Sequence, residues 1–254
     1  MSHPLIHPSA AEGFQASADA YDRGRPSYPA DAIDFIARKF KFSPGKIIVD
    51  LGAGTGKLTQ QLLPYGPRLM AIEPIAGMRQ KFSQRLPQVP ILEGSAEAMP
   101  IPSQSVDIVL VGQAFHWFDG ASALSEIARV LKPGGRLGLL WNVRDESVAW
   151  VSQLTRIIDI YEAGTPRYRS GKWKAAFEAQ QSLTIPEMTR FKLSHFGTVQ
   201  TVIDRMASIS FIAALPEPVR AQVLEQVRSL LRDFPETFEI PYRTEVYLSR
   251  KIQP

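Results

Sequence analysis

The sequence predicts an α/β protein built on a doubly wound, mostly parallel sheet. The clearest indication is the apolar run over residues 47–51, which ends in a glycine-rich turn and then opens a helix. A second is the β-branched run over residues 105–111, which suits a central strand buried on both faces. A third is the alternation of such strands with helical segments along the chain. The 254 residues suffice for one domain of this kind with an insertion.

The first part of the chain, residues 1–45, is expected to form an N-terminal cap. It begins with a polar segment, and a helix follows Pro29 over residues 31–42. Residues 46–145 are expected to form the half of the domain that binds the ligand. There the patterns predict a strand at 47–51, a helix at 57–63, strands at 68–73, from 89 and at 105–111, a helix at 120–130, a turn at 132–135 and a strand at 136–141.

The strand–helix alternation stops after Trp141 and resumes near residue 186. The interruption, residues 147–185, is predicted to be a substrate lid, because ligands of open α/β sheets bind at the carboxyl ends of the strands. It contains an expected helix at 147–162, a basic aromatic loop at 164–171 and a short helix at 173–180. Residues 186–254 complete the sheet, with strands expected at 189–196 and 238–249 and helices at 198–208 and 217–234.

The glycine turn is the first candidate binding feature. Gly52, Gly54 and Gly56 remove side chains where the backbone turns sharply and a ligand approaches closely. Asp50 at the strand end would repel a diphosphate but accept a cationic cofactor. Lys57 stands where the dinucleotide fingerprint G-x-G-x-x-G has its third glycine, so a nicotinamide-dependent dehydrogenase is disfavoured. The alternative is a turn that simply connects a strand to a helix.

Glu73 is the second candidate. It ends the next strand about 20 residues beyond the glycines, where nucleotide-binding βαβ units place an acidic residue on the ribose hydroxyls. An ordinary solvated glutamate is the alternative.

Further motifs complete a pattern that resembles class I S-adenosylmethionine (SAM)-dependent methyltransferases over about residues 21–145. The resemblance is carried by VDLGAGTGKLT, Glu73, EGSAEAMP, SVDIVLVGQAFHWF and ARVLKPGGRL. Within that superfamily the chain is similar to small-molecule enzymes related to trans-aconitate methyltransferases, which share a Y-x-x-x-R-P-x-Y-P stretch and a His-Trp pair after the fourth strand. The resemblance implies a seven-stranded Rossmann-like sheet of order 3-2-1-4-5-7-6 with an antiparallel last strand.

The resemblance also implies a cofactor site for SAM, with S-adenosyl-L-homocysteine (SAH) as product. The glycine turn would surround the methionine moiety, Glu73 would hold the ribose, and residues 95–97 would lie at the adenine edge. The implied contacts are Tyr21, Arg25, Asp50, Gly52, Ala53, Gly54, Gly56, Glu73, Pro74, Met78, Ser95, Ala96, Glu97 and Gln113. The acceptor is expected to meet Tyr28, Phe115, His116, Trp117 and Arg144.

Three of these residues carry open alternatives. His116 is the candidate general base, because imidazole titrates near neutral pH, or else a purely structural group. Arg25 suits a carboxylate of the cofactor or of an acidic substrate, or is merely solvated. Arg144 binds an acidic substrate or pairs with Asp145.

The expected reaction is methyl transfer to a small molecule, first to an oxygen of a carboxylate or hydroxyl, since this needs only positioning and desolvation. Carbon and nitrogen acceptors stay open, as does a catalytically silent SAM-binding protein. A nucleic-acid methyltransferase is less favoured, because the N-P-P-Y/F tetrapeptide is replaced by residues 112–115, GQAF.

Composition limits the chemistry, the partners and the location that the chain is expected to have. The absence of cysteine excludes disulfides and thiolate chemistry, and the four histidines are too scattered to predict a metal site. No apolar run approaches the ~20 residues of a membrane span and no secretory signal is seen, so a cytoplasmic protein without a membrane partner is expected. The net charge of +4 is spread along the chain, which makes nucleic acid an unlikely partner. A monomer or homodimer is expected.

Overall fold

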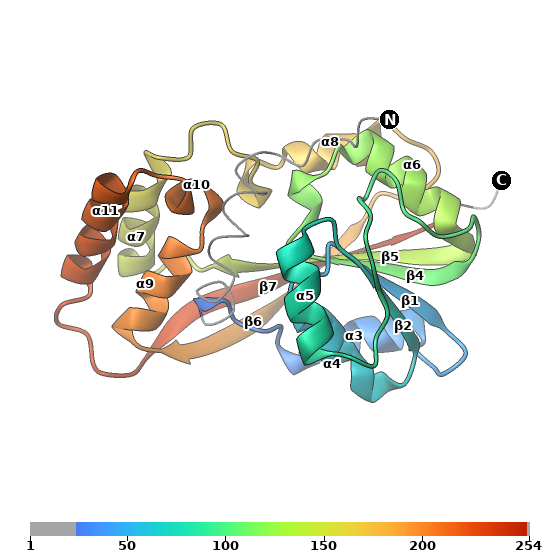
Figure 1. Ribbon diagram of the computed structural model, residues 1–254, viewed down its shortest axis with the longest axis horizontal. Coiled ribbons are helices and arrows are strands. Elements are labelled where there is room, and N and C mark those ends of the chain that lie inside the picture. The colour runs from blue at the N-terminus through green and yellow to red at the C-terminus, as the bar shows by residue number, and fades with distance from the viewer. Residues whose placement is uncertain (1–23, 253–254) are drawn as a thin grey trace.

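The sheet has the predicted order and orientation. A computed structural model describes residues 24–252 and contains one seven-stranded sheet of order β3-β2-β1-β4-β5-β7-β6 (Figure 1). The first five strands are parallel, and β7 runs antiparallel to both β5 and β6. The strands are β1 Ile47–Leu51, β2 Arg68–Ile72, β3 Ile91–Leu92, β4 Val106–Gly112, β5 Leu131–Arg144, β6 Glu187–Gly197 and β7 Phe238–Arg250.

Helices cover both faces of the sheet. They are α3 Ala30–Phe40, α4 Lys57–Leu62, α5 Ala76–Arg85, α6 Gly120–Val130, α7 Ala149–Asp159, α8 Ala175–Glu178, α9 Val199–Ala207, α10 Ser210–Ala213 and α11 Glu217–Leu230. Short 3-10 turns are η1 Leu63–Tyr65, η2 Phe115–Trp117, η3 Tyr168–Ser170 and η4 Lys172–Lys174.

The alternation of side chains along the central strands shows which face of the sheet these helices cover. Ile48 of β1 packs with α3 and α4, whereas its neighbour Val49 packs in the cluster that contains α6. Successive side chains of a strand point to opposite faces, so a continuous apolar run is buried on both sides. The β-branched runs that predicted central strands are therefore confirmed as such.

Several boundaries differ from the expectation. Helices α5 and α10 were not anticipated, and the predicted helix at 173–180 is reduced to η4 and the four-residue α8. Strand β5 begins at Leu131 instead of residue 136, because the expected turn at 132–135 is a bulge inside the strand. Its register on β4 jumps from Val106–Leu131 to Ile108–Arg136, and Gly134 takes a left-handed φ of 72° within the bulge.

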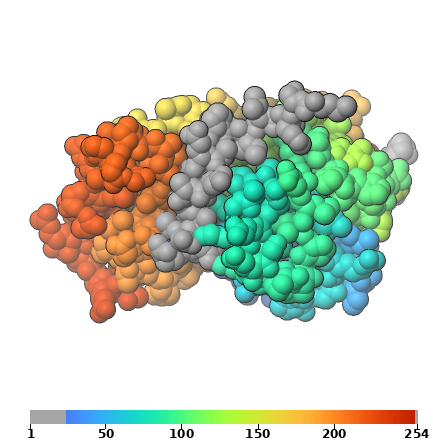
Figure 2. Space-filling model, viewed as in Figure 1, coloured from blue at the N-terminus to red at the C-terminus, as the bar shows by residue number. Residues whose placement is uncertain are grey.

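The insertion after β5 divides between two parts of the molecule. Helix α7 packs with α9, α10 and α11 through residues such as Leu154 and Met206, forming the lobe at the left of Figure 1. The chain then returns toward α6, where Trp173 and Phe177 join the core beside β4 and β5. Figure 2 shows the C-terminal helices in orange and residues near 60–130 in teal and green as two masses along the long axis. The predicted lid is thus anchored to both masses.

Within residues 24–252, none of the helices combines the length and the apolar character needed to cross a membrane.

Candidate functional site

The glycine turn after β1 needs glycine for conformation and for space. Gly52, Gly54 and Gly56 have φ values of 70°, 57° and 87°, in the left-handed region. A Cβ at Gly52 would lie 2.9 Å from the Cβ of Ala114, and one at Gly56 would lie 2.8 Å from Leu86 Cδ1. The turn therefore presents bare backbone at the carboxyl end of β1.

Asp50 is a buried carboxylate at the start of this turn. Its side chain is 1% exposed, and its Oδ2 accepts a hydrogen bond of 2.5 Å from the Thr59 hydroxyl. Its Oδ1 is buried and has no hydrogen-bond partner among the described residues. Burial raises the pKa of Asp50 to about 7, although the bond from Thr59 opposes this rise. A cation placed at Oδ1 would satisfy the unpaired atom and stabilise the carboxylate.

Glu73 connects β2 to the glycine turn. Its Oε2 accepts the backbone N–H of Gly54 at 2.9 Å, and its Oε1 accepts the N–H of Ile75 at 3.0 Å. Burial raises its pKa, and these two bonds oppose the rise. Each carboxylate oxygen has a further lone pair, so Glu73 retains the capacity to accept bonds from two hydroxyls.

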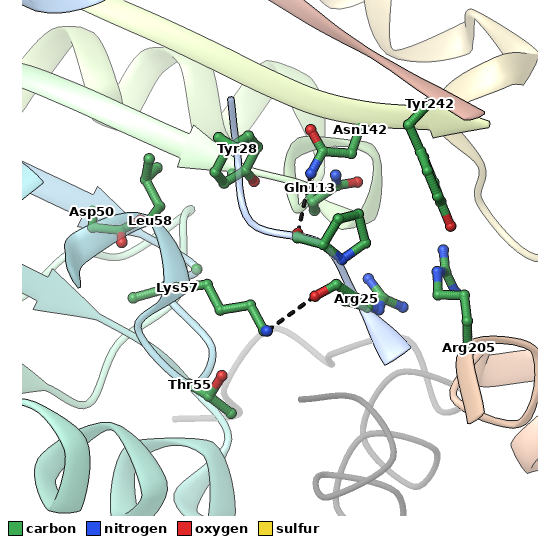
Figure 3. A pocket seen from close by; sticks show the side chains of 14 residues that line it. Arg25, Tyr28, Asp50, Thr55, Lys57, Leu58, Gln113, Asn142, Arg205 and Tyr242 are labelled. Atoms are coloured by element: carbon green, nitrogen blue, oxygen red, sulfur yellow. Dashed lines mark hydrogen bonds between the residues drawn. The ribbon is translucent and has the colours of Figure 1, made fainter. Parts of the chain in front are cut away.

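Asp50 faces a cavity that we call the Asp50 hollow, with an empty volume of about 570 Å³ that includes open solvent (Figure 3). Predicted site residues form much of its wall: Arg25, Tyr28, Asp50, Gly52, Ala53 and Gln113. In Figure 3, Asp50 lies on one side, and Arg25, Arg205 and Tyr242 lie on the other. The described wall of the hollow thus contains one carboxylate, Asp50, together with the cationic side chains Arg25, Lys57 and Arg205.

The segment after Gly24 passes over this hollow and is fastened on both sides. Lys57 Nζ donates to the carbonyl oxygen of Arg25 at 3.0 Å, and Asn142 Nδ2 donates to that of Pro26 at 3.2 Å (Figure 3). A Cβ at Gly24 would lie only 2.5 Å from the backbone nitrogen of Arg205, so the segment rests directly on α9. Three residues of the predicted N-terminal cap, Arg25, Pro26 and Tyr28, therefore line the hollow.

Gln113 stands where the Asp50 hollow meets a second cavity. It follows β4 with a φ of 62°, a conformation that is uncommon outside glycine, and its N–H donates to Leu140 at 2.8 Å. The second cavity has an empty volume of about 850 Å³, open solvent included. The two cavities share wall residues Arg25, Gln113, Asn142, Arg205 and Tyr242.

Five arginines line this second cavity, which we call the arginine hollow: Arg25, Arg144, Arg167, Arg169 and Arg205. Glu146 is the one carboxylate among its described lining residues. Arg167 and Arg169 both pair with Asp159 and Glu162, so these two charges are compensated. Arg144 and Arg205 make no ion pair among the described residues, and their charges point to an anionic ligand.

Arg144 makes no ion pair among the described residues. It is buried, and its guanidinium contacts Thr155 Oγ1 at 3.4 Å and Met206 Sδ at 3.9 Å. Its Nε and the Nη1 of Arg205 are buried without a hydrogen-bond partner among the described residues. Burial and the nearby Arg205 lower the pKa of Arg144 to about 10. The predicted alternative of an Arg144–Asp145 pair is wrong, because Asp145 instead pairs with Arg243 at 3.8 Å.

His116 lines the arginine hollow as predicted, but its chemistry differs from that of a base. Its Nδ1 accepts a hydrogen bond of 3.2 Å from Trp141 Nε1. Burial, Arg25 and Arg167 lower the pKa of His116 to about 3. A ring that stays neutral and has one nitrogen already occupied is a poor proton acceptor at neutral pH.

The other predicted contacts differ in where they lie. Trp117 lines the arginine hollow, and Tyr28 lines the Asp50 hollow instead of the acceptor side. Phe115 needs a correction: it is fully buried against Phe118, Trp173 and Phe177, so its ring supports the floor of the site and faces neither hollow. The remaining predicted cofactor contacts are not in the described walls of either hollow; they are Gly54, Gly56, Glu73, Pro74, Met78, Ser95, Ala96 and Glu97. Tyr21 lies outside the described residues.

Sequence reasoning missed several wall residues. Arg205 and Tyr242 come from α9 and β7, and Arg167 and Arg169 come from the segment at η3. Arg205 is 180 positions beyond Arg25, and no local pattern marks either residue as a partner of the other. The basic residues that are scattered in sequence gather in the folded chain. No cluster of His, Asp or Glu that could hold a metal ion occurs in the part of the chain that the structure describes.

Comparison with known protein families and with curated proteins identifies methyltransferases. The family described as a methyltransferase domain matches residues 49–139, which span β1 to β5. An uncharacterized methyltransferase of Mycobacterium tuberculosis is 41% identical over 228 residues, covering 87% of this chain and 86% of the relative. An uncharacterized methyltransferase-like protein of Schizosaccharomyces pombe is 34% identical over 244 residues, covering 94% and 95%.

Solved structures agree on the fold. A putative type II methyltransferase of Anaeromyxobacter dehalogenans superposes with a TM-score of 0.66 at 21% identity, covering 91% of this chain and 99% of that one. A geranyl diphosphate methyltransferase solved with SAM gives a TM-score of 0.51 at 15% identity, covering 92% and 95%.

Proposed function

This chain belongs to the methyltransferase family, and on that premise we propose that it transfers the methyl group of SAM to an oxygen atom of a small anionic acceptor. The observation that carries the proposal is the arginine hollow, which adjoins the Asp50 hollow and shares five wall residues with it. The donor and the acceptor would then meet near Gln113.

The residues of the Asp50 hollow fit SAM. The unpartnered Oδ1 of Asp50 would accept the cofactor's ammonium group, and Gly52 and Ala53 of the glycine turn, which line the hollow, would lie beside its methionine moiety. Glu73, which touches this turn through Gly54, would accept the ribose hydroxyls. When bound, SAM supplies a methyl group activated by a sulfonium. Two buried carboxylates suit a cofactor with positive charges and oppose a diphosphate.

The residues of the arginine hollow fit an anion. Arg144 and Arg205 are buried cations with unpartnered nitrogen atoms, and an acceptor carboxylate or phenolate would pair with them. Binding an anion there would also relieve the repulsion between these two guanidinium groups. The resemblance to trans-aconitate methyltransferases makes small polycarboxylic acids the first acceptors to test.

The proposed mechanism follows from the placement of the donor in the Asp50 hollow and of the acceptor in the arginine hollow. Arg144 and Arg205 would bind and orient the acceptor, Gln113 and Asn142 would form the wall between the two ligands, and the docked insertion would exclude water. An oxygen that is already anionic needs no general base. The low pKa of His116 is therefore compatible with the proposed reaction.

The test is a transfer assay with methyl-labelled SAM. Each of a series of small carboxylic acids and phenols is offered beside a neutral counterpart, such as the primary amide of the same acid. We expect label to reach at least one acid and to be recovered as its methyl ester or ether, with the neutral counterpart inert. Efficient methylation of neutral or cationic acceptors, with every acid inert, would overturn the proposal.

A further inference from the structure

Trp141 makes a hydrogen bond that determines where His116 carries its proton. An indole N–H is only a donor, so the 3.2 Å contact from Trp141 Nε1 requires a lone pair on His116 Nδ1. A neutral imidazole with a lone pair on Nδ1 has its hydrogen on Nε2. None of the hydrogen bonds among described residues uses His116 Nε2, and His116 lines the arginine hollow. The ring therefore has an N–H donor to offer to a ligand.

The orientation of Trp141 is itself fixed by the insertion. Trp141 is 1% exposed, and its ring lies 4.6 Å from Tyr168 and 4.8 Å from Trp173, at interplanar angles of 30° and 33°. Tyr247 meets it edge-on at 5.7 Å. The Tyr168 hydroxyl donates to the Glu245 carboxylate, and Trp173 Nε1 donates to the Tyr168 carbonyl oxygen at 3.2 Å. An indole held on these sides has little freedom to turn its N–H away from His116.

The charged groups around His116 also favour the neutral form of its ring. Arg25 from the N-terminal segment and Arg167 from the insertion both oppose a positive charge on the ring. Glu146, the carboxylate in the wall of the same hollow, is exposed to solvent. Trp117 packs beside the ring at a centroid distance of 5.1 Å. The surroundings favour the neutral form and Trp141 selects its tautomer.

We propose that Trp141 is a positioning residue that holds His116 as the Nε2–H tautomer, so that His116 donates a hydrogen bond to the acceptor anion and does not take a proton from it. The donor role rests on the proposed function, whereas the tautomer does not. His116 would then act with the arginines in orienting the acceptor oxygen, and the insertion would set this geometry through Tyr168 and Trp173.

The test is nuclear magnetic resonance of protein labelled with ¹⁵N in histidine and tryptophan side chains, recorded without acceptor. The His116→Gln variant identifies the signals among the four histidines. We expect the Nε2–H pattern for His116, no titration above about pH 5, and a coupling across the hydrogen bond from Trp141 Nε1 to His116 Nδ1. In Trp141→Phe, both tautomers should appear and the titration midpoint should rise.

Trp173→Phe is the matched control. It keeps an aromatic ring beside Trp141, removes only the indole N–H that bonds to Tyr168, and leaves the bond to His116, so the His116 signals should keep the wild-type pattern. In transfer assays Trp141→Phe should raise the acceptor KM about tenfold, the loss of roughly 1.4 kcal/mol, and Trp173→Phe should raise it less.

Three results would overturn the inference: an Nδ1–H tautomer in the wild type, titration near the ordinary histidine pKa of about 6.5, or a Trp141→Phe spectrum identical to the wild type. If Trp141→Phe does not fold, the wild-type tautomer and the coupling across the hydrogen bond decide alone. If the tautomer is found but no acid is methylated, the proposed function fails and the tautomer assignment stands.

Discussion

The two hollows share Arg25 and Arg205 but differ in their other charged groups. The Asp50 hollow contains a buried carboxylate and two residues of the glycine turn, Gly52 and Ala53, together with Lys57. The arginine hollow is built from five guanidinium groups, at least two of which have buried, unpartnered nitrogen atoms. Under the proposed function, the ammonium group of the methyl donor would lie beside Asp50 and an anionic acceptor beside Arg144.

The largest expected effect comes from removing the Asp50 carboxylate, which would abolish the difference between the two hollows. Asp50→Asn keeps an oxygen that accepts from Thr59 but loses the charge that faces the hollow. Truncating one side of a buried charge pair costs about 2–5 kcal/mol, so SAH affinity should fall at least about 30-fold. Calorimetric titration with SAH measures the loss. An affinity equal to that of the wild type would remove Asp50 from the cofactor site.

Removing one arginine tests the other side. Arg144→Gln should lower kcat/KM for an acid acceptor by about 10- to 100-fold, since hydrogen bonds to charged groups contribute about 1.5–3 kcal/mol. SAH affinity should be unchanged, because Arg144 lines only the arginine hollow. Arg169→Gln is the control: its charge is balanced by Asp159 and Glu162, and a smaller loss is expected. Equal losses in the two variants would show that compensation by carboxylates does not matter here.

The pH dependence of cofactor binding sharpens the comparison. The pKa of Asp50 is raised to about 7 in the free protein, and a bound cation favours the carboxylate, so binding expels a proton below that pH. SAH affinity should therefore rise about tenfold between pH 6 and pH 8. In Asp50→Asn this rise should be absent. A wild-type affinity that is flat across this range would contradict the raised pKa.

The same group makes a prediction about folding stability. A carboxyl whose folded pKa exceeds its unfolded value adds stability that is fully present below the unfolded pKa and is lost as the pH rises through the folded pKa. Asp50 should therefore destabilise the free protein progressively from about pH 4 to about pH 7, and Asp50→Asn should have the higher melting temperature at pH 8. A lower melting temperature for this variant at pH 8 would mean that the buried charge is compensated within the protein.

The smallest expected effect concerns the anchoring of the insertion over the arginine hollow. Tyr168→Phe removes the hydroxyl that donates to Glu245, which should cost about 0.5–1.5 kcal/mol of unfolding free energy and raise the acceptor KM a few-fold. Tyr161→Phe is a control within the same insertion, since its hydroxyl has no hydrogen bond among the described residues. Urea denaturation compares the two; an equal or greater loss for Tyr161→Phe would show that the Glu245 contact does not anchor the insertion.

The two hollows also differ in how far the sequence predicts them. The proposed donor side, residues 50–56 and Glu73, comes from one strand end, one turn and the next strand, so the spacing in sequence carries its geometry. The burial of the central strands on both faces follows from equally local patterns, whereas the strand order is implied by the resemblance; both are confirmed. The adenine and ribose contacts, that of Glu73 included, stay predictions.

No local sequence pattern predicts the proposed acceptor side. Arg144, Arg167 and Arg205 come from β5, the insertion and α9, and their distance in the fold depends on how α7 packs against α9 and α11. Phe115 illustrates the same limit, because its aromatic character suits either a ligand or the core, and tertiary packing with Trp173 and Phe177 decides for the core. A residue type alone does not indicate which of these environments it will occupy.

The most direct test of the central claim, that the Asp50 hollow holds a cationic methyl donor, is calorimetric titration of the wild-type protein with SAH and, separately, with NAD. The two ligands share an adenosine, but SAH brings an ammonium group where NAD brings a diphosphate. The account predicts saturable binding of one SAH per chain and no measurable binding of NAD. Binding of NAD with no binding of SAH would contradict it.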